Sequence, residues 1–146
     1  MAEASTAAVS PLVLVVDDDA AIRELASDVL ARAGFRTLTA TDGAEVLELA
    51  VTHQPGLIVL DVMMPNMDGY TTLTRLRGHP ATREIPVVIL TAQDQPFYRT
   101  LSAGVGAVAH MTKPFSSSLL SETVQRILAE RQTRVTEERP TRRAPG

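Results

Sequence analysis

Five apolar residues run directly into three aspartates in the stretch Leu12-Val13-Leu14-Val15-Val16-Asp17-Asp18-Asp19. The apolar part has no polar alternation, which is typical of a short strand buried on both faces of a sheet. From Ala20 to Ala33 the apolar residues follow helical spacing, and Gly34 stands where a glycine commonly follows a helix. The stretch therefore predicts a buried strand, an acidic turn and a helix as the first structural unit.

Similar units recur along the rest of the chain. We expect the remaining strands at 37–40, 57–60, 87–90 and 106–110. We expect the remaining helices at about 42–52, 67–77, 96–103 and 117–131. Strands and helices that alternate at this spacing form parallel sheets with right-handed crossovers. The sequence thus predicts an α/β fold: a doubly wound five-stranded parallel sheet with five helices, of the flavodoxin-like kind.

Length and composition suit one globular domain. The chain has 146 residues, of which 45% are apolar and 21% are charged. It contains no apolar run long enough for a membrane span and no signal peptide at its start, so we expect a cytoplasmic protein that does not bind membranes. The absence of cysteine excludes disulfides and thiolate chemistry.

Charge is spread unevenly. The segment 131–146 holds five arginines and two glutamates, whereas the whole chain has a net charge of -3. The part before this segment is therefore acidic, which argues against nucleic-acid binding. We expect residues 1–10 to be a disordered lead and residues 132–146 a disordered basic tail, around a domain at 11–131.

Chemistry-bearing side chains follow the predicted strands at their carboxyl ends, where open doubly wound sheets bind ligands. They are Asp17, Asp18 and Asp19 after the first strand, Asp61 after the third, Thr91 at the end of the fourth and Lys113 after the fifth. A single aspartate at such a place is commonly a turn former or helix cap, the role we assign to Asp19. Two more behind a buried strand repel one another unless a cation offsets them, and Mg²⁺ prefers such oxygen ligands.

Lys113 is the only lysine in a chain with thirteen arginines. A flexible ammonium reaches a phosphate oxygen as a point charge, where a guanidinium fork would be bulky. The hydroxyl of Thr91 is placed to hydrogen-bond an oxygen of a group attached to Asp61. Each residue alone also fits a plain structural role, but together with the aspartates they predict a site for phosphate chemistry.

Four segments resemble the signatures of bacterial response-regulator (CheY-like) receiver domains, in the family's order and spacing. They are Val15-Val16-Asp17-Asp18-Asp19, Leu57-Ile58-Val59-Leu60-Asp61-Val62-Met63-Met64-Pro65-Asn66-Met67-Asp68-Gly69, Leu90-Thr91-Ala92 and Thr112-Lys113-Pro114-Phe115. The resemblance covers roughly residues 11–131. A chance match of all four segments is far less probable than a match of one.

The resemblance implies a phosphorelay switch rather than an enzyme proper. Asp61 would accept a phosphoryl group from a sensor histidine kinase or a histidine phosphotransfer protein. Asp18, Asp61 and the backbone carbonyl of Met63 would ligate Mg²⁺, with Asp17 acting through water. Thr91 and Lys113 would hold the phosphoryl oxygens.

The family also implies a cis peptide between Lys113 and Pro114 and a switch made by Thr91 and an aromatic residue three before the lysine. Here His110 stands at the aromatic position. The signal would leave through the surface of the fourth helix, fifth strand and fifth helix to a downstream protein. We expect that phosphorylation draws Thr91 towards Asp61 and His110 inward.

Three interpretations of the function differ in which part of the protein transmits the signal. About fifteen residues follow the last predicted helix, which favours a stand-alone switch that acts through protein–protein contacts. A receiver cut from a longer multidomain regulator is the second reading. A receiver-like interaction module that works without phosphorylation is the third, and the full set of site residues disfavours it.

Overall fold

The computed structural model describes residues 10–62, 69–92, 104 and 106–143. Its strands are β1 (Leu12–Val16), β2 (Arg36–Ala40), β3 (Leu57–Leu60), β4 (Val87–Thr91) and β5 (Ala109–Thr112). Its helices are α2 (Ala20–Arg32), α3 (Gly43–His53), α4 (Gly69–Gly78) and α6 (Ser117–Arg143). The helix predicted at 96–103 lies outside the described residues, as does Met63.

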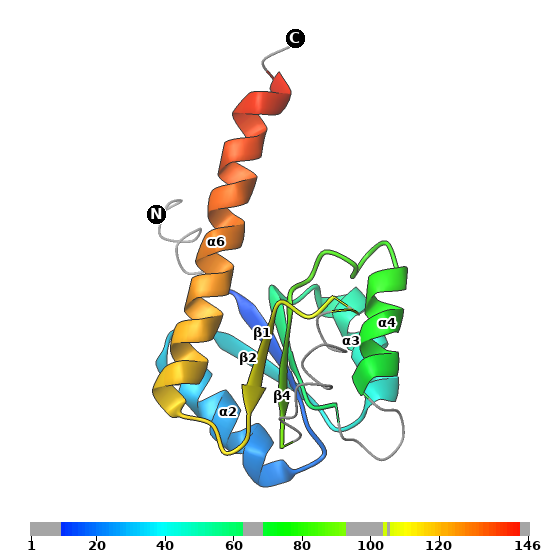
Figure 1. Cartoon of the computed structure of the whole chain (residues 1–146), viewed down its shortest axis with the longest axis vertical. Helices are drawn as coiled ribbons and strands as arrows, with labels where there is room; N and C mark the ends of the chain where they lie inside the picture. The colour runs from blue at the N-terminus through cyan, green and yellow to red at the C-terminus, as the bar shows by residue number, and fades with distance from the viewer. Residues whose placement is uncertain (1–9, 63–68, 93–103, 105, 144–146) are drawn as a thin grey trace.

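All five strands form one parallel sheet in the order β2-β1-β3-β4-β5, which confirms the predicted fold (Figure 1). From β1 the chain crosses first to β2 on one side and then to β3 on the other. The strand order therefore reverses between β1 and β3. This is the place at which doubly wound sheets bind ligands.

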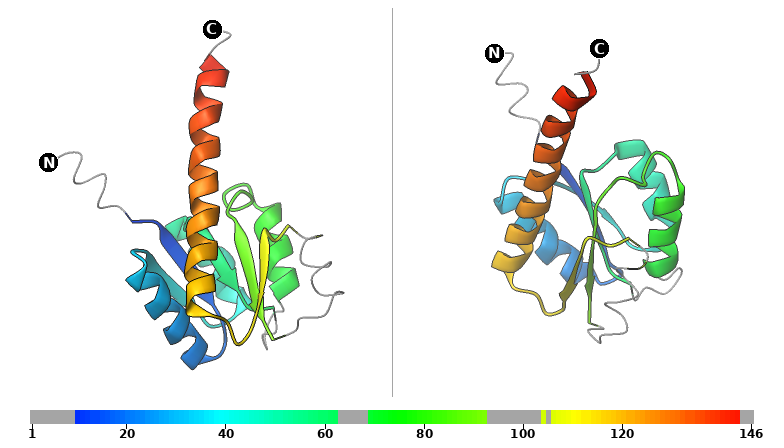
Figure 2. Two further views of the ribbon diagram at one scale, coloured as in Figure 1. Left: turned by 60° about the vertical axis from the view of Figure 1, so that its left-hand side comes forward. Right: turned by 45° about the horizontal axis from the view of Figure 1, so that its top comes forward.

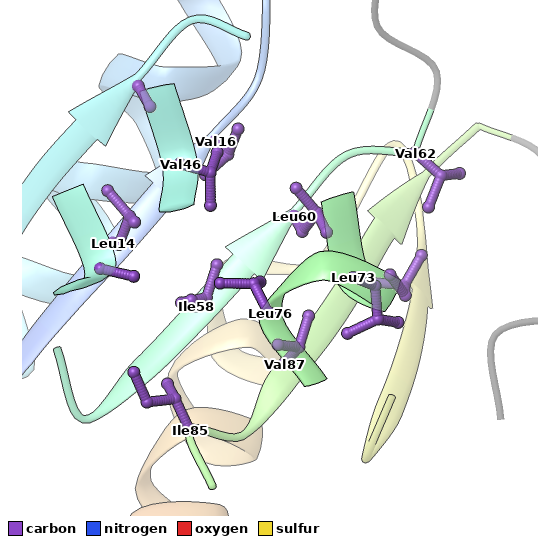
Figure 3. Close-up of a cluster of buried hydrophobic side chains, with 13 residues drawn as sticks. Leu14, Val16, Val46, Ile58, Leu60, Val62, Leu73, Leu76, Ile85 and Val87 are labelled. Atoms are coloured by element: carbon purple, nitrogen blue, oxygen red, sulfur yellow. The ribbon is translucent and has the colours of Figure 1, made fainter. Parts of the chain in front are cut away.

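Alternate residues of the central strands enter two separate cores. Leu14, Val16, Ile58 and Leu60 pack with Val46 of α3 and with side chains of α4 on one face (Figure 3). Their neighbours along the strands pack with α2 and α6 on the other face. This explains why the strands are apolar without interruption: both sides of the sheet are covered.

The helix caps follow the sequence. Asp19 accepts a hydrogen bond from the N–H of Ala21 at 2.9 Å, and Asp42 accepts one from the N–H of Ala44 at the same distance. Ser116 Oγ accepts one from the N–H of Leu119 at 3.2 Å. Each cap satisfies an N–H that has no partner inside its helix.

The fifth strand begins later than predicted. The sequence favours a strand at 106–110, whereas β5 spans Ala109–Thr112. Gly106 has a φ of +98°, and its carbonyl accepts a hydrogen bond from Arg77 Nη2 at 3.0 Å. Because the chain turns beneath Arg77, it joins β4 only at Val108, whose N–H donates to the carbonyl of Val87 at 2.9 Å.

The last helix runs further than predicted. We expect a disordered tail from residue 132, but α6 continues to Arg143 and projects past the sheet at the end opposite to the carboxyl ends of the strands (Figures 1 and 2). Its continuation starts with strong helix formers at 129–132, and no glycine occurs between residues 107 and 145. Within the described part of the chain, no helix is long and apolar enough to span a membrane.

Candidate functional site

Asp17 and Asp61 are neighbours because they follow neighbouring strands. The N–H of Asp61 donates to the carbonyl of Val16 at 3.0 Å, so the ladder between β1 and β3 continues into the site. Only 1% of Asp17 and 3% of Asp61 are exposed. Two carboxyl groups are thus held at the switch point of the sheet, largely out of water.

Lys113, which directly follows β5, reaches both of these carboxylates. Its N–H donates to the carbonyl of Thr91 at 2.9 Å, which fixes the backbone after β5. Its Nζ lies 2.6 Å from Asp17 Oδ2 and 3.1 Å from Asp61 Oδ2. The peptide that joins Lys113 to Pro114 is cis, as predicted.

The electrostatics follow from burial and from this ion pairing. Burial raises the pKa of Asp17, and the hydrogen bond from Lys113 only partly opposes that rise. Burial alone would lower the pKa of Lys113, but the hydrogen bond to Asp17 and the charge of Asp61 together outweigh it and raise that pKa. One ammonium is therefore shared between two buried carboxylates.

Asp18 completes an oxygen cluster. It is exposed, and one carboxylate oxygen from each of Asp17, Asp18 and Asp61 lies within 4.8 Å of the others. Three carboxylates beside one ammonium leave the cluster with excess negative charge. An all-oxygen donor set with one open side suits a hard divalent cation such as Mg²⁺, which keeps several waters.

Two residues that the sequence analysis did not assign to the site support it. Arg23 Nη1 donates to the carbonyl of Asp17 at 2.8 Å, which anchors the acidic turn to α2. At Gly69, a Cβ atom would lie 2.4 Å from Val62 Cα and 2.8 Å from the carbonyl oxygen of Asp61. In the sequence, Gly69 is the last residue of the second family-like segment, and the structure shows why position 69 requires a residue without a side chain: it packs directly against the backbone of Asp61 and Val62.

The remaining predicted residues lie at different depths. Thr91 is fully buried at the end of β4, in register with Thr112. His110 is partly buried inside β5, opposite Ile89, rather than at the end of the strand. The predicted metal ligand Met63 cannot be placed, because it lies outside the described residues.

The model of the response regulator receiver domain family matches residues 13–125. The chain belongs to this family. This receiver is 42% identical over 116 residues to the alkaline phosphatase synthesis transcriptional regulatory protein PhoP of Bacillus subtilis, a match that covers 80% of this chain and 48% of PhoP. It is 38% identical over 109 residues to Protein PilG of Pseudomonas aeruginosa, covering 74% of this chain and 80% of PilG.

Solved receiver structures agree with the fold. The receiver superposes on the chemotaxis protein CheY4 of Vibrio cholerae with a TM-score of 0.77 and 34% identity, covering 81% of this chain and 98% of CheY4. Against PhoP and the next curated relatives, the chain spans about half of the relative's length. Those relatives therefore extend well beyond a receiver.

Proposed function

We propose that this receiver accepts a phosphoryl group on Asp61 from a sensor histidine kinase or a histidine phosphotransfer protein. The observation that carries the proposal is the pair of contacts from Lys113 Nζ to Asp17 and Asp61, at 2.6 and 3.1 Å. A buried carboxylate beside an ammonium group can act as a nucleophile. The acyl phosphate that it forms is stabilised by the positive charge of that ammonium.

Each site residue has one task in this proposal. Asp61 Oδ attacks the phosphorus atom, and the donor's leaving group departs from the opposite side. Lys113 Nζ neutralises charge on a phosphoryl oxygen, and the Thr91 hydroxyl donates to another. Phosphoryl transfer needs positioning and charge neutralisation more than covalent help, and buried side chains on a rigid sheet edge supply both.

The oxygen cluster fits Mg²⁺. Asp18, Asp61 and the carbonyl of Met63 would hold the ion, with Asp17 acting through water, and the ion would supply positive charge beside the phosphoryl oxygens. The support from this chain is the approach of three carboxylate oxygens within 4.8 Å. Replacing Asp18 with asparagine should weaken Mg²⁺ affinity yet keep the acceptor, and an unchanged affinity would show that the metal site is misplaced.

The deciding experiment is phosphorylation by acetyl phosphate with Mg²⁺, read by mass spectrometry, since the chain has no tryptophan for a fluorescence assay. We expect one phosphoryl group on Asp61 and none in Asp61→Asn or after chelation of Mg²⁺. Asp28→Asn is a matched control, because Asp28 is an exposed aspartate paired with Arg32 on α2. Full incorporation in Asp61→Asn would overturn the assignment.

The proposed output is a change around β5. Thr91 and Thr112 are in register, and His110 lies two residues before Thr112 on the same strand. The ring nitrogens of His110 are already shielded from solvent. When Thr91 moves towards the phosphoryl group, His110 is repositioned, and the surface made by the helix predicted at 96–103, β5 and α6 is remodelled for a downstream protein. NMR shifts with beryllofluoride test this step, and a silent His110 would refute the coupling.

The proposed setting is the cytoplasm, where the phosphoryl donors named above are found. A stand-alone switch and the receiver of a longer regulator share this chemistry and differ in where the output lies. The full reading frame of the gene distinguishes the two. A module that works without phosphorylation would keep its partner affinity in Asp61→Asn, whereas the proposed switch loses its response to acetyl phosphate.

A further inference from the structure

A groove of about 370 Å³ lies between α3 and α4, on the face of the sheet opposite α2 and α6. Its lining includes Ala44, Leu47, Glu48 and Val51 of α3 and Arg75 and His79 of the α4 side. None of the site residues described above lines it. Its volume is that of a small-molecule pocket, and it is too small to take up a whole helix.

The α3 side of the groove is mainly apolar. Ala44, Leu47 and Val51 recur at helical spacing and share one face of α3, beside the buried Val46 and Ala50. Val51 remains 37% exposed. The groove therefore offers apolar surface that no described side chain covers completely.

Opposite charges line the two walls without meeting. Glu48 stands on α3 and Arg75 on α4, both exposed, and within the described part of the chain neither makes a hydrogen bond or an ion pair. On α2, by contrast, Asp28 and Arg32 close to 3.1 Å. The open groove keeps Glu48 and Arg75 apart, so each charge is available to something that lies between them.

His79 adds a second donor on the α4 side. Its Nδ1 accepts a hydrogen bond from the N–H of Ala81 at 3.1 Å. A neutral imidazole that accepts at Nδ1 carries its proton on Nε2, so this ring is a donor at its other nitrogen. The groove thus combines one acceptor wall, an apolar middle and a wall with two donors.

We propose that the groove between α3 and α4 binds a small zwitterion in which an apolar chain separates an ammonium from a carboxylate. The ammonium lies against Glu48, the chain lies over Leu47 and Val51, and the carboxylate meets Arg75 and His79. A ligand of this kind satisfies both walls at once, whereas a simple anion or cation leaves one charge without a partner. This site is independent of phosphorylation at Asp61.

The test uses ε-aminocaproate and two probes that each keep one of its charges, caproate and hexylamine, with the full chain and methyl-detected NMR. γ-Aminobutyrate serves as a shorter zwitterion. We expect saturable shifts of the Leu47 and Val51 methyl signals and about fivefold tighter binding of the best zwitterion than of either single-charge probe. Absence of saturable shifts with both zwitterions, or equal affinity for all the probes, would overturn the proposal.

Variants of the two walls measure how much each wall contributes to zwitterion affinity. Glu48→Gln should reduce zwitterion affinity to that of caproate, and Arg75→Gln should reduce it to that of hexylamine. Glu24→Gln and Arg83→Gln are matched controls, since both residues are exposed and neither lines the groove. Backbone spectra verify that each variant folds. Equal weakening in the controls would mean that general surface charge, not the groove, binds the probe.

Discussion

Two partly buried cations flank β5, and they are held in opposite ways. Lys113 follows the strand and contacts the carboxylates of Asp17 and Asp61. Arg77 reaches the turn before the strand, where it donates to the carbonyls of Gly106 at 3.0 Å and Arg83 at 3.2 Å. At one end of β5 a cation thus forms ion pairs with carboxylates, and at the other end a cation donates hydrogen bonds to backbone carbonyls.

The pKa values of the two cations shift in opposite directions. Burial disfavours the charged form of both side chains. It lowers the pKa of Arg77, the nearby charge of Arg131 lowers it further, and Glu84 opposes this only weakly. For Lys113 the carboxylates outweigh burial, so its pKa rises. Arg77 contacts backbone carbonyls, which are structural partners, whereas Lys113 contacts carboxylates and, under the proposed function, would pair with a phosphoryl oxygen on Asp61.

The largest expected difference between the two ends concerns phosphorylation. Lys113→Met should slow phosphorylation of Asp61 by acetyl phosphate about 100-fold, because it removes the only ammonium at the reacting oxygens. Arg77→Met removes a cation of similar burial at the far end of β5 and should leave the rate near wild type. Mass-spectrometric time courses compare the two, and similar losses in both variants would abolish the distinction.

Arg77 should matter more for stability than for chemistry. Arg77→Met leaves the carbonyls of Gly106 and Arg83 without their donors, so we expect a loss of about 2 kcal/mol in the free energy of unfolding. Urea titrations followed by circular dichroism measure it. Wild-type stability of Arg77→Met would mean that water replaces both hydrogen bonds.

Excess negative charge at the Lys113 end predicts a stabilising variant. Burial raises the folded-state pKa of Asp17 above 3.8, so protonated Asp17 favours the folded state. This stabilisation is complete below pH 3.8 and is lost as the pH rises through the folded-state pKa. Asp17→Asn keeps the neutral form at every pH. Without Mg²⁺, Asp17→Asn should be more stable than wild type at pH 7, and the two proteins should be equally stable at low pH, where Asp17 is protonated. A destabilised Asp17→Asn would show instead that Lys113 depends on both carboxylates.

The smallest effect concerns the fit between Arg77 and Gly106. A Cβ at residue 106 would lie 2.8 Å from Arg77 Nε, and a positive φ strains any side chain there. Gly106→Ala should therefore cost less in the Arg77→Met background, with a coupling of about 0.5 kcal/mol in a double-mutant cycle. Additive losses would mean that the backbone angle alone requires glycine.

The fold was predictable because each central strand is a continuous apolar run that ends at a polar residue. Leu57–Leu60 has the predicted bounds, and β1 ends where the aspartates begin. The start of β5 was not predictable, since the contact of Gly106 with Arg77 joins residues 29 positions apart. The continuation of α6 differs from the expected disordered tail, which charge and proline suggested, although residues 129–132 are strong helix formers.

The site was predictable as a set of strand ends but not in its supporting contacts. Parallel strands bring their carboxyl ends to one edge, so Asp17, Asp61 and Lys113 had to converge once the strand order was known. The support from Arg23 and Gly69 depends on how the loops pass one another, and a single sequence carries no periodic signal for that. The place of His110 inside β5 follows from the shifted strand start.

The projecting part of α6 is a lever arm. Leu120, Val124 and Ile127 fix its base to the sheet, and the helix begins four residues after Lys113. Leu128 still packs on the core and Arg131 still lines a pocket with Pro86 and Val108, so the projecting part runs from Arg131 to Arg143, about 18 Å at a rise of about 1.5 Å per residue. A tilt of about 10° at the base would carry the tip through about 3 Å, so a shift at the sheet too small to disturb the core would be magnified at the far end of the helix.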